Sequence, residues 1–328
     1  MRRREFITLT GAAAVAWPLG TEAQQSQRMR RVGVLMATVA SQESMAWYTA
    51  FLQRLQELGW IDGRNVRMDI RWVAGDAERA RKYAGELVAL APDVIMAVGS
   101  AGLGPVLQTT RTVPIVFALI VDPVGSGFVK SLSRPGGNVT GFMQFEYTLS
   151  GKWPELLKEI TPNVKRVAVL RDAALASGIG QFAVIQASAA SVGVEPSPID
   201  VGDPLEIERA VAAFADSANG GLIVTAGPLS SAHGDLMIAL AAQYKLPAIY
   251  PQRFYAKGGG LISFGPNFVE ELRGAAGYVD RVLRGEKPAD LPVQAPTRYE
   301  LVVNLKTAKA LGLEIPSSVL ARADELIE

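Results

Sequence analysis

Two short apolar runs, separated by a short amphipathic segment, constrain the fold of this chain more than any other feature of its sequence. Residues 94–98 and 114–121 are each too brief for a helix, are rich in β-branched residues and end at small or turn-forming residues. They are typical of buried parallel strands, here connected by the short amphipathic segment at 103–110 as the crossover. Ligands of open parallel sheets bind outside the carboxyl ends of the strands. The residues at these ends are Ser100, Ala101 and Asp122.

The same pattern returns later in the chain, which indicates an internal repeat. Residues 32–35 correspond to 167–170, and residues 114–117 correspond to 247–250, with an offset of roughly 130 residues. A chain of 328 residues also exceeds the length at which a single hydrophobic core usually stops growing. The sequence therefore predicts an α/β protein with two doubly wound parallel-sheet lobes joined by a hinge.

The periodic pattern also predicts where one lobe gives way to the other. Periodicity is lost between Phe145 and Leu149, where we place the first crossing, and the helix predicted at 267–283 is expected to return to the first lobe. The predicted lobes and the remaining segment are 31–147 plus about 267–290 for the first lobe, 148–266 for the second, and 291–328 for a linker and tail that the pattern does not assign.

Composition excludes several classes of function. The formal net charge is +1, and no basic stripe with interleaved aromatic residues appears, so the sequence gives no case for nucleic acid binding. The chain has no cysteine and one histidine, which excludes disulfides, thiolate nucleophiles and metal sites built from several histidines. No cofactor or metal is expected.

The first 23 residues have the pattern of an export signal. Three arginines at 2–4 precede a short, mainly apolar stretch at 7–19, and Thr21-Glu22-Ala23 is a small-x-small cleavage site. The arginines followed by Glu5-Phe6-Ile7 also resemble a twin-arginine signal. A membrane anchor is the alternative, although the apolar stretch falls short of the ~20 residues of a spanning helix. We expect cleavage near Ala23 and a periplasmic protein.

Catalytic signals are weak. Ser230, His233 and Asp235 lie close together in the sequence, but a catalytic triad requires these groups to converge in space beside an oxyanion hole. The ordinary interpretation is a helix start with Ser230 or Ser231 as its N-cap. Residues 178–180 (Gly-Ile-Gly) are interpreted as a turn rather than a phosphate loop, because the third glycine and the acidic partner are missing.

Binding signals are stronger and lie at the predicted strand ends. Hydroxyls at Thr38, Ser100 and Thr225, together with free helix amides, suit a carboxylate, although each hydroxyl also suits a helix cap. Asp122 and Asp172 suit an ammonium group, with turn formation as the alternative interpretation. An aromatic wall is predicted at Tyr250, for which a place in the core is the competing interpretation.

Several spaced segments resemble a family of bacterial proteins nearly end to end. They include Leu58-Gly59-Trp60, Pro114-Ile115-Val116-Phe117 with Asp122-Pro123, and the stretch from Arg134 to Gly141 (RPGGNVTG). Later matches are 285–294 (GEKPADLPVQ), 305–313 (LKTAKALGL) and 320–325 (LARADE). The chain resembles the periplasmic substrate-binding proteins of ABC transporters that are related to tryptophan and tyrosine uptake receptors.

This resemblance implies a type I periplasmic-binding-protein fold that closes on a small ligand. The positions that it implies for the cleft are Thr38, Ser100, Ala101, Ala118, Ile120 and Asp122 in the first lobe, and Asp172, Thr225 and Tyr250 in the second. Relatives often carry small or hydroxylated residues near 118 and 120, where this chain has Ala118 and Ile120. This departure bears on the identity of the ligand.

The sequence and the resemblance together predict a non-enzymatic solute receptor. It is expected to bind an aromatic or branched-chain amino acid, or a related carboxylate, between its lobes and to deliver it, as a monomer, to an ABC permease in the inner membrane. Two alternatives are a ligand sensor for a membrane kinase and, with less support, a hydrolase that uses the same cleft.

Overall fold

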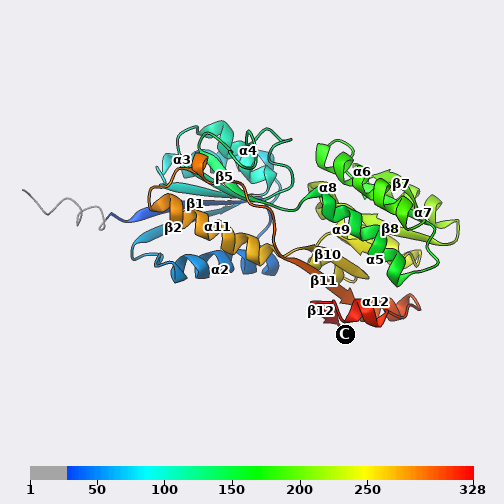
Figure 1. Cartoon of the computed structure of the whole chain (residues 1–328). Coiled ribbons are helices and arrows are strands. Elements are labelled where there is room, and N and C mark those ends of the chain that lie inside the picture. The colour runs from blue at the N-terminus through cyan, green and yellow to red at the C-terminus, as the bar shows by residue number, and fades with distance from the viewer. Residues whose placement is uncertain (1–27) are drawn as a thin grey trace, which may run out of the picture.

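The computed structural model describes residues 28–328, which form two α/β lobes placed side by side (Figure 1). The predicted export signal lies outside the described residues. Within the described range, no helix combines the length and the apolar character that crossing a membrane requires.

The first lobe is built on a five-stranded, fully parallel sheet with the order β2-β1-β3-β4-β5. Successive side chains of each strand point to opposite faces of the sheet, and both faces are covered by helices, as a fully parallel sheet requires. The strands are β1 (Arg30–Met36), β2 (Val66–Trp72), β3 (Val94–Val98), β4 (Ile115–Ile120) and β5 (Val139–Met143). The helices of this lobe are α2 (Gln42–Glu57), α3 (Ala77–Ala89), α4 (Ser100–Thr109) and α11 (Phe268–Leu283).

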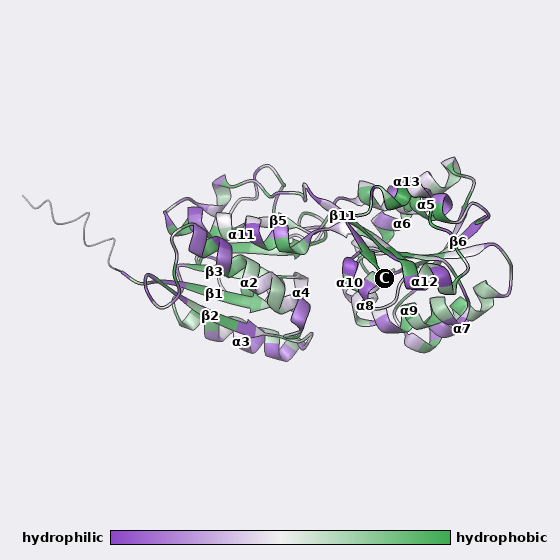
Figure 2. Cartoon of the chain, turned by 90° about the horizontal axis from the view of Figure 1, so that it is seen from below, coloured by the Kyte–Doolittle hydropathy of each residue, from purple (hydrophilic) through white to green (hydrophobic). Residues whose placement is uncertain are grey.

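Each face of this sheet has its own hydrophobic core. Val34, Met96 and Val116 pack against α2 and α11 on one face, and Ile95 and Phe117 pack against α3 and α4 on the other. Figure 2 shows the hydrophobic strands β1 and β3 between helices whose outer surfaces carry hydrophilic residues. The doubly wound arrangement predicted from the sequence is therefore confirmed for this lobe.

The second lobe holds a seven-stranded sheet with the order β12-β11-β10-β9-β8-β6-β7. All neighbouring strands are parallel except β10 and β11, which are antiparallel. Its strands are β6 (Arg166–Arg171), β7 (Glu195–Asp200), β8 (Gly220–Val224), β9 (Ala248–Tyr250), β10 (Ile262–Pro266), β11 (Tyr299–Asn304) and β12 (Glu325–Ile327). Its helices are η1 (Tyr147–Gly151), α5 (Lys152–Ile160), α6 (Ala176–Ser191), α7 (Pro204–Ala215), α8 (Pro228–Ala232), α9 (Gly234–Gln243), α10 (Arg253–Lys257), α12 (Leu305–Ala310) and α13 (Ser317–Leu320).

Three segments of the described chain cross between the lobes. The first runs from β5 to η1, the second from β10 to α11, and the third from the segment after α11 to β11. Helix α11 packs against α2, and the Trp60 indole donates a hydrogen bond to Asp280 on α11 at 2.8 Å. The short helix η2 (Pro288–Asp290) lies beside β5, where the Thr140 hydroxyl donates to the Leu291 carbonyl at 2.6 Å.

The tail after the third crossing belongs to the second sheet, an assignment that the sequence pattern did not make. Residues 262–266 of β10 pair in antiparallel register with residues 299–303 of β11, and β12 then adds in parallel at the edge. The tail therefore completes the second lobe rather than the first.

Three local predictions are wrong: a helix start, a turn and a helix cap. Helix α4 begins at Ser100 rather than Leu103, because Gly99 with φ of 76° turns the chain sharply after β3. Residues 178–180 lie inside α6 rather than in a turn. Ser230 and Ser231 lie within α8, whose N-cap is Gly227, so neither serine is the cap.

Candidate functional site

The carboxyl ends of the parallel strands in each lobe lie at the edge of the sheet where the chain crosses to the other lobe. Strand β5 ends at Met143 immediately before the first crossing, and β10 ends at Pro266 immediately before the second. The loops after β1, β3 and β4 therefore lie at the same edge as one crossing, and the loops after β6, β8 and β9 at the same edge as the other. These six loops make up the candidate site, which we call the interlobe rim.

The first helix start on this rim is well suited to an anion. Ser100 and Ala101 are exposed, the N-cap Gly99 offers no side chain, and the first amides of α4 have no acceptor within the helix. A β-carbon on Gly102 would lie 3.2 Å from the Leu35 carbonyl oxygen, so a small residue there lets the helix start lie close to the end of β1. The structure thus places two predicted residues where free amides point outward.

Thr38 follows β1 on the same rim. Its hydroxyl is buried and has no hydrogen-bond partner among the described residues, while its carbonyl accepts the Ala74 amide at 3.3 Å. The nearby α2 begins with a capping box, in which the Ser41 and Ser44 side chains bond to each other's backbone amides. The N-terminus of α2 is therefore already capped by these serines, and the Thr38 hydroxyl is not needed as a cap.

Asp122 connects the two lobes directly. One carboxylate oxygen accepts the Gly125 amide at 2.7 Å, as a turn-forming aspartate does, and the other accepts the Tyr147 hydroxyl at 2.9 Å. Burial and the Asp122 carboxylate both raise the pKa of the Tyr147 phenol, so this phenol stays a donor. A β-carbon on Gly180 would lie 2.8 Å from the Tyr147 ring, which explains why glycine occupies that position in α6.

Asp172 lies at the end of β6, on the rim of the second lobe. Its side chain is 5% exposed, and one oxygen accepts the Ala174 amide at 3.0 Å. A β-carbon on Gly178 would lie 2.0 Å from the Asp172 carbonyl oxygen. Helix α6 can therefore rest on the end of this strand only because residue 178 is glycine.

Thr225 and Gln181 shape the loop after β8. Thr225 is buried and donates its hydroxyl to the Leu170 carbonyl at 3.0 Å, so in this conformation the hydroxyl serves the sheet rather than a ligand. Gln181 on α6 is fully buried, donates to the Ala226 carbonyl and accepts the Ala226 amide, each at 2.8 Å. Sequence reasoning missed Gln181, although Gln181 and Gln186 are the two amides among the small and apolar residues of 176–190 and are an available signal.

Three predicted contacts are not available in this conformation. Ala118 and Ile120 have fully buried side chains that pack on opposite faces of the first sheet. Tyr250 is also fully buried, and its ring stacks on Tyr255 with centroids 5.0 Å apart. Ala118 and Ile120 lie on opposite faces although they are two residues apart, because Leu119 has φ of 59° and the pairing of β4 with β5 shifts register between Phe117 and Ile120. For Tyr250, the core interpretation is the correct one. Phe145, another predicted wall residue, is 1% exposed.

Apolar side chains at the rim come instead from the loops and first helical turns. Eight large hydrophobic side chains are exposed in the described chain, and five of them lie in these places. Such clustering of exposed apolar residues marks a surface that becomes covered. The five residues are Val39, Met45 and Val124 in the first lobe, and Leu175 and Ile179 in the second.

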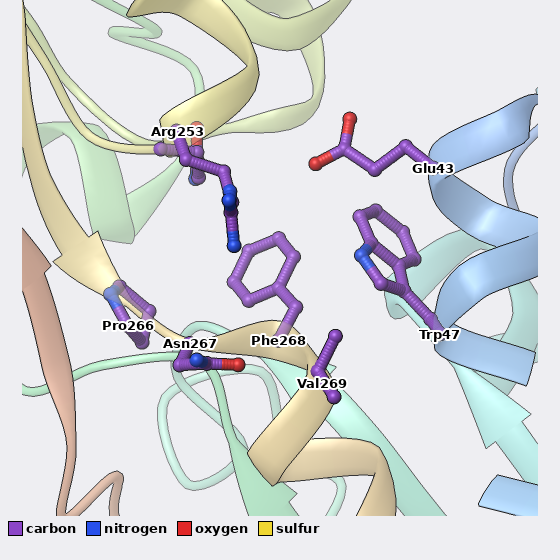
Figure 3. Close-up of a pocket in the computed structure, with 8 residues that line it drawn as sticks. Glu43, Trp47, Arg253, Pro266, Asn267, Phe268 and Val269 are labelled. Atoms are coloured by element: carbon purple, nitrogen blue, oxygen red, sulfur yellow. The ribbon is translucent and has the colours of Figure 1, made fainter. Parts of the chain in front are cut away.

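Beside the second crossing, charged and aromatic side chains of the two lobes approach each other (Figure 3). Glu43 and Trp47 come from α2, Arg253 begins α10, and Phe268 begins α11. Trp47 and Phe268 meet edge to face with ring centroids 5.2 Å apart. Burial raises the pKa of Glu43, and the positive charge of Arg253 partly opposes that shift. The Glu43 carboxylate therefore faces a cation of the opposite lobe.

The residues of the hydrolase alternative do not form a triad. Ser230 is fully buried, and its hydroxyl has no hydrogen-bond partner in the described part of the chain. No hydrogen bond within that part joins Ser230 to His233 or His233 to Asp235, and His233 lies between α8 and α9. The geometry gives this alternative no support.

Known proteins share this architecture. The family described as ABC transporter substrate binding protein matches residues 32–327. A tyrosine-binding protein of Clostridioides difficile is 27% identical over 271 residues, which cover 80% of this chain and 76% of that protein.

Two solved structures align over most of the chain. The crystal structure of an ABC domain in complex with L-Trp from Streptococcus pneumoniae has a TM-score of 0.82 and 26% identity, covering 91% of this chain and 99% of that one. A conserved domain protein from Vibrio cholerae also has a TM-score of 0.82, with 28% identity, and covers 91% of this chain and 100% of that one. The two lobes, the strand-end rim and the match along nearly the whole described chain lead to one conclusion: this protein belongs to the ABC transporter substrate-binding protein family, with the type I periplasmic-binding fold.

Proposed function

We propose that this chain is the solute receptor of an ABC importer and that it binds an aromatic or branched-chain amino acid, or a related carboxylate, at the interlobe rim. The observation that carries this proposal is the composition of the rim. Free amides at the start of α4 lie on one lobe, the Asp172 carboxylate lies on the other, and exposed apolar side chains flank both. This is the complement of a molecule with a carboxylate, an ammonium group and an apolar body.

Each end of the ligand has an assigned partner. The carboxylate is held by the amides of Ser100 and Ala101 and by the Ser100 hydroxyl, because helix N-termini attract anions. The ammonium group is held by Asp172. The apolar body contacts Val39 or Val124 on one side and Leu175 or Ile179 on the other. The L-Trp named with one structural relative and the tyrosine named with another relative support this choice of ligand class.

In this proposal the protein binds and releases its ligand and does not catalyse a reaction. Ligand contacts with both lobes favour a closed state, and the difference in affinity between the two states shifts their populations. The permease then recognises the closed surface. We also propose that the protein is exported to the periplasm, is cleaved near Ala23 and acts as a monomer. N-terminal sequencing of the periplasmic protein tests the cleavage site.

Calorimetric titration of the mature chain with the twenty amino acids and a set of aromatic carboxylates tests the ligand class. We expect Ser100→Ala to weaken binding of the best amino acid about five- to tenfold, which corresponds to the loss of one hydrogen bond of about 1 kcal/mol. Asp172→Asn, which keeps the shape of the side chain, is expected to weaken it more than tenfold, since hydrogen bonds to charged groups contribute ~1.5–3 kcal/mol.

Matched controls separate these effects from general damage. Ser217→Ala and Asp216→Asn change exposed side chains between α7 and β8, away from the strand-end loops, and should leave affinity unchanged. Binding only of sugars or phosphorylated compounds, or unchanged affinity in both rim variants, would show that the site assignment is wrong.

A further inference from the structure

A second cavity lies in the second lobe, at the opposite edge of its sheet from the interlobe rim. Its walls come from α9 and α12, from the segment before β9 and from the glycine-rich turn before β10. Figure 2 shows α9 and α12 next to each other on this lobe. The volume is about 320 Å³, which lies at the lower end of the ~300–1,000 Å³ of small-molecule sites.

The walls of this cavity are held in place by the chain itself. A β-carbon on Gly260 would lie 2.6 Å from the Tyr250 ring, so glycine at this position allows the ring to lie against the turn. The Thr307 hydroxyl donates to the Gly259 carbonyl at 2.8 Å, and the Asn304 amide donates to the Ala256 carbonyl at 2.9 Å. The cavity is therefore a built feature of the lobe, and it gives the run of three glycines at 258–260 a structural role.

Three of the polar side chains that line the cavity have no partner among the described residues. Tyr250 lines it and is fully buried, yet its hydroxyl has no hydrogen-bond partner among the described residues. A buried hydroxyl without a partner is costly, which favours a ligand or water that supplies one. Lys245 and Lys306 also line the cavity, both are exposed, and neither has a carboxylate within 4.0 Å in the described part of the chain.

We propose that this cavity is a second binding site, which takes a small apolar monocarboxylate independently of the interlobe ligand. The apolar body lies against side chains such as Ile238 and Leu311, the Tyr250 hydroxyl bonds to an oxygen of the ligand, and the two lysines neutralise its carboxylate. The two unpaired cations exclude a cationic ligand, and the mainly apolar wall disfavours a sugar.

Octanoate and its neutral analogue octanamide test this site on the mature chain by calorimetry. Octanoate should bind and octanamide should bind on the order of fivefold more weakly, because the amide lacks the charge that the lysines neutralise. Lys245→Ala with Lys306→Ala should lower octanoate affinity by a similar factor. Lys309→Ala removes an exposed charge from the same helix outside the cavity wall and should change nothing.

Two further variants test the location. Ala310 is exposed and lines the cavity, so Ala310→Trp fills the mouth from the surface and should abolish octanoate binding, with a circular dichroism melt to establish that the variant folds. Tyr250→Phe keeps the ring and should weaken octanoate a fewfold. Equal binding of octanoate to Ala310→Trp and to the wild type would overturn the proposal. Absence of octanoate binding to the wild type would also overturn it, and would point to a cavity that receives a side chain of the permease instead.

Addition of the best interlobe ligand at saturation distinguishes the two sites. Octanoate affinity should stay within twofold of its value without that ligand, because the cavity lies at the edge where β9 and β10 begin, whereas the interlobe ligand binds where they end. Competition between the two ligands would place octanoate at the rim and would overturn the second site.

Discussion

Gly178 has no room for a β-carbon. In Gly178→Ala the new methyl group would lie 2.0 Å from the Asp172 carbonyl oxygen, which is backbone and cannot rotate away. We expect a loss of about 3 kcal/mol or more in the free energy of unfolding, at the upper end of overpacking effects. Because the displaced strand end carries Asp172, binding at the interlobe rim should also weaken. Urea unfolding and calorimetry measure the two effects.

Gly277→Ala is the matched control for this prediction. Gly277 also lies within a helix, α11. Apart from its chain neighbours and the nearby backbone of its own helix, no atom lies within 4 Å of the position that a β-carbon would take. The alanine should therefore stabilise the protein by about 0.5–1 kcal/mol through helix propensity. Equal stability of the two variants would refute the steric explanation of Gly178.

Glu271 is a buried carboxyl group in the first turn of α11. It is 5% exposed, and one of its oxygens has no hydrogen-bond partner among the described residues. Burial raises its pKa to about 8, and the neighbouring Glu270 carboxylate adds to this shift. The helix N-terminus favours the charged form by only ~0.3–1 kcal/mol, so the cost of burial dominates.

This raised pKa predicts how stability depends on pH. An unfolded glutamate titrates near about 4.3, so between that pH and about 8 the folded state binds more protons than the unfolded state. The contribution of Glu271 to stability is therefore complete below about pH 4.3 and falls as pH rises through about 8, by at most about 1.4 kcal/mol per pH unit.

Glu271→Gln should remove this loss and make the protein more stable than the wild type above pH 8. Unfolding in urea at several pH values, compared between the two proteins, isolates the effect from other titrating groups. Glu270→Gln changes the exposed neighbour and should retain most of the pH dependence. Parallel stability curves for wild type and Glu271→Gln would contradict the prediction.

At the scale of elements, the contact between η1 and the loop after β4 holds the lobes together next to the first crossing. Tyr147→Phe removes only the hydroxyl that donates to Asp122, and Asp122→Asn removes the charge but keeps an oxygen for the Gly125 amide. Both groups are half-buried, so we expect each variant to lose about 1 kcal/mol of stability. The double variant should lose less than the sum, with a coupling energy of about 0.5–1 kcal/mol.

Tyr244→Phe is the control for this cycle, because that phenol lies at the end of α9 and makes no side-chain hydrogen bond within the described chain. Its stability should match that of the wild type. Strict additivity of the two rim substitutions would mean that the hydrogen bond contributes nothing to the relative position of the lobes.

Elements were predictable where local pattern decides them. The central strands were found because short β-branched runs end at turn-forming residues, as 94–98 does. The start of α4 was missed because it depends on the backbone angle of Gly99, and the tail was not assigned because the pairing of β11 with β10 is not local in sequence. The internal repeat and the strand order predicted where the interlobe rim lies. They did not predict which of its side chains are exposed. Ile120 was predicted there and is buried, whereas Leu175 was not predicted and is exposed.

At the scale of the whole molecule, the exposed apolar residues of the rim and the facing charges of Glu43 and Arg253 favour a state in which the lobes approach. Covering apolar surface contributes roughly 25 cal/mol per Å², and a ligand that contacts both lobes adds its own differential affinity. Three segments connect the lobes, so any change in their relative position is taken up in these segments. Closure on the ligand is thus the expected mechanism for the receptor role.

Spin labels on introduced cysteines test this closure without interference, because the chain has no cysteine of its own. Ser126→Cys and Ala232→Cys place labels on exposed positions of opposite rims, and Ser126→Cys with Arg64→Cys places both labels on the first lobe. With saturating ligand, the distance between the interlobe labels should shorten and its distribution should narrow, whereas the distance within the first lobe should stay constant.

Introducing Glu43→Gln into the interlobe pair should leave the ligand-free distance unchanged and weaken closure, since it removes the charge that attracts Arg253. Small-angle scattering of the unlabelled chain should show the same compaction. An interlobe distance that does not change when calorimetry proves binding would refute hinge closure for this receptor.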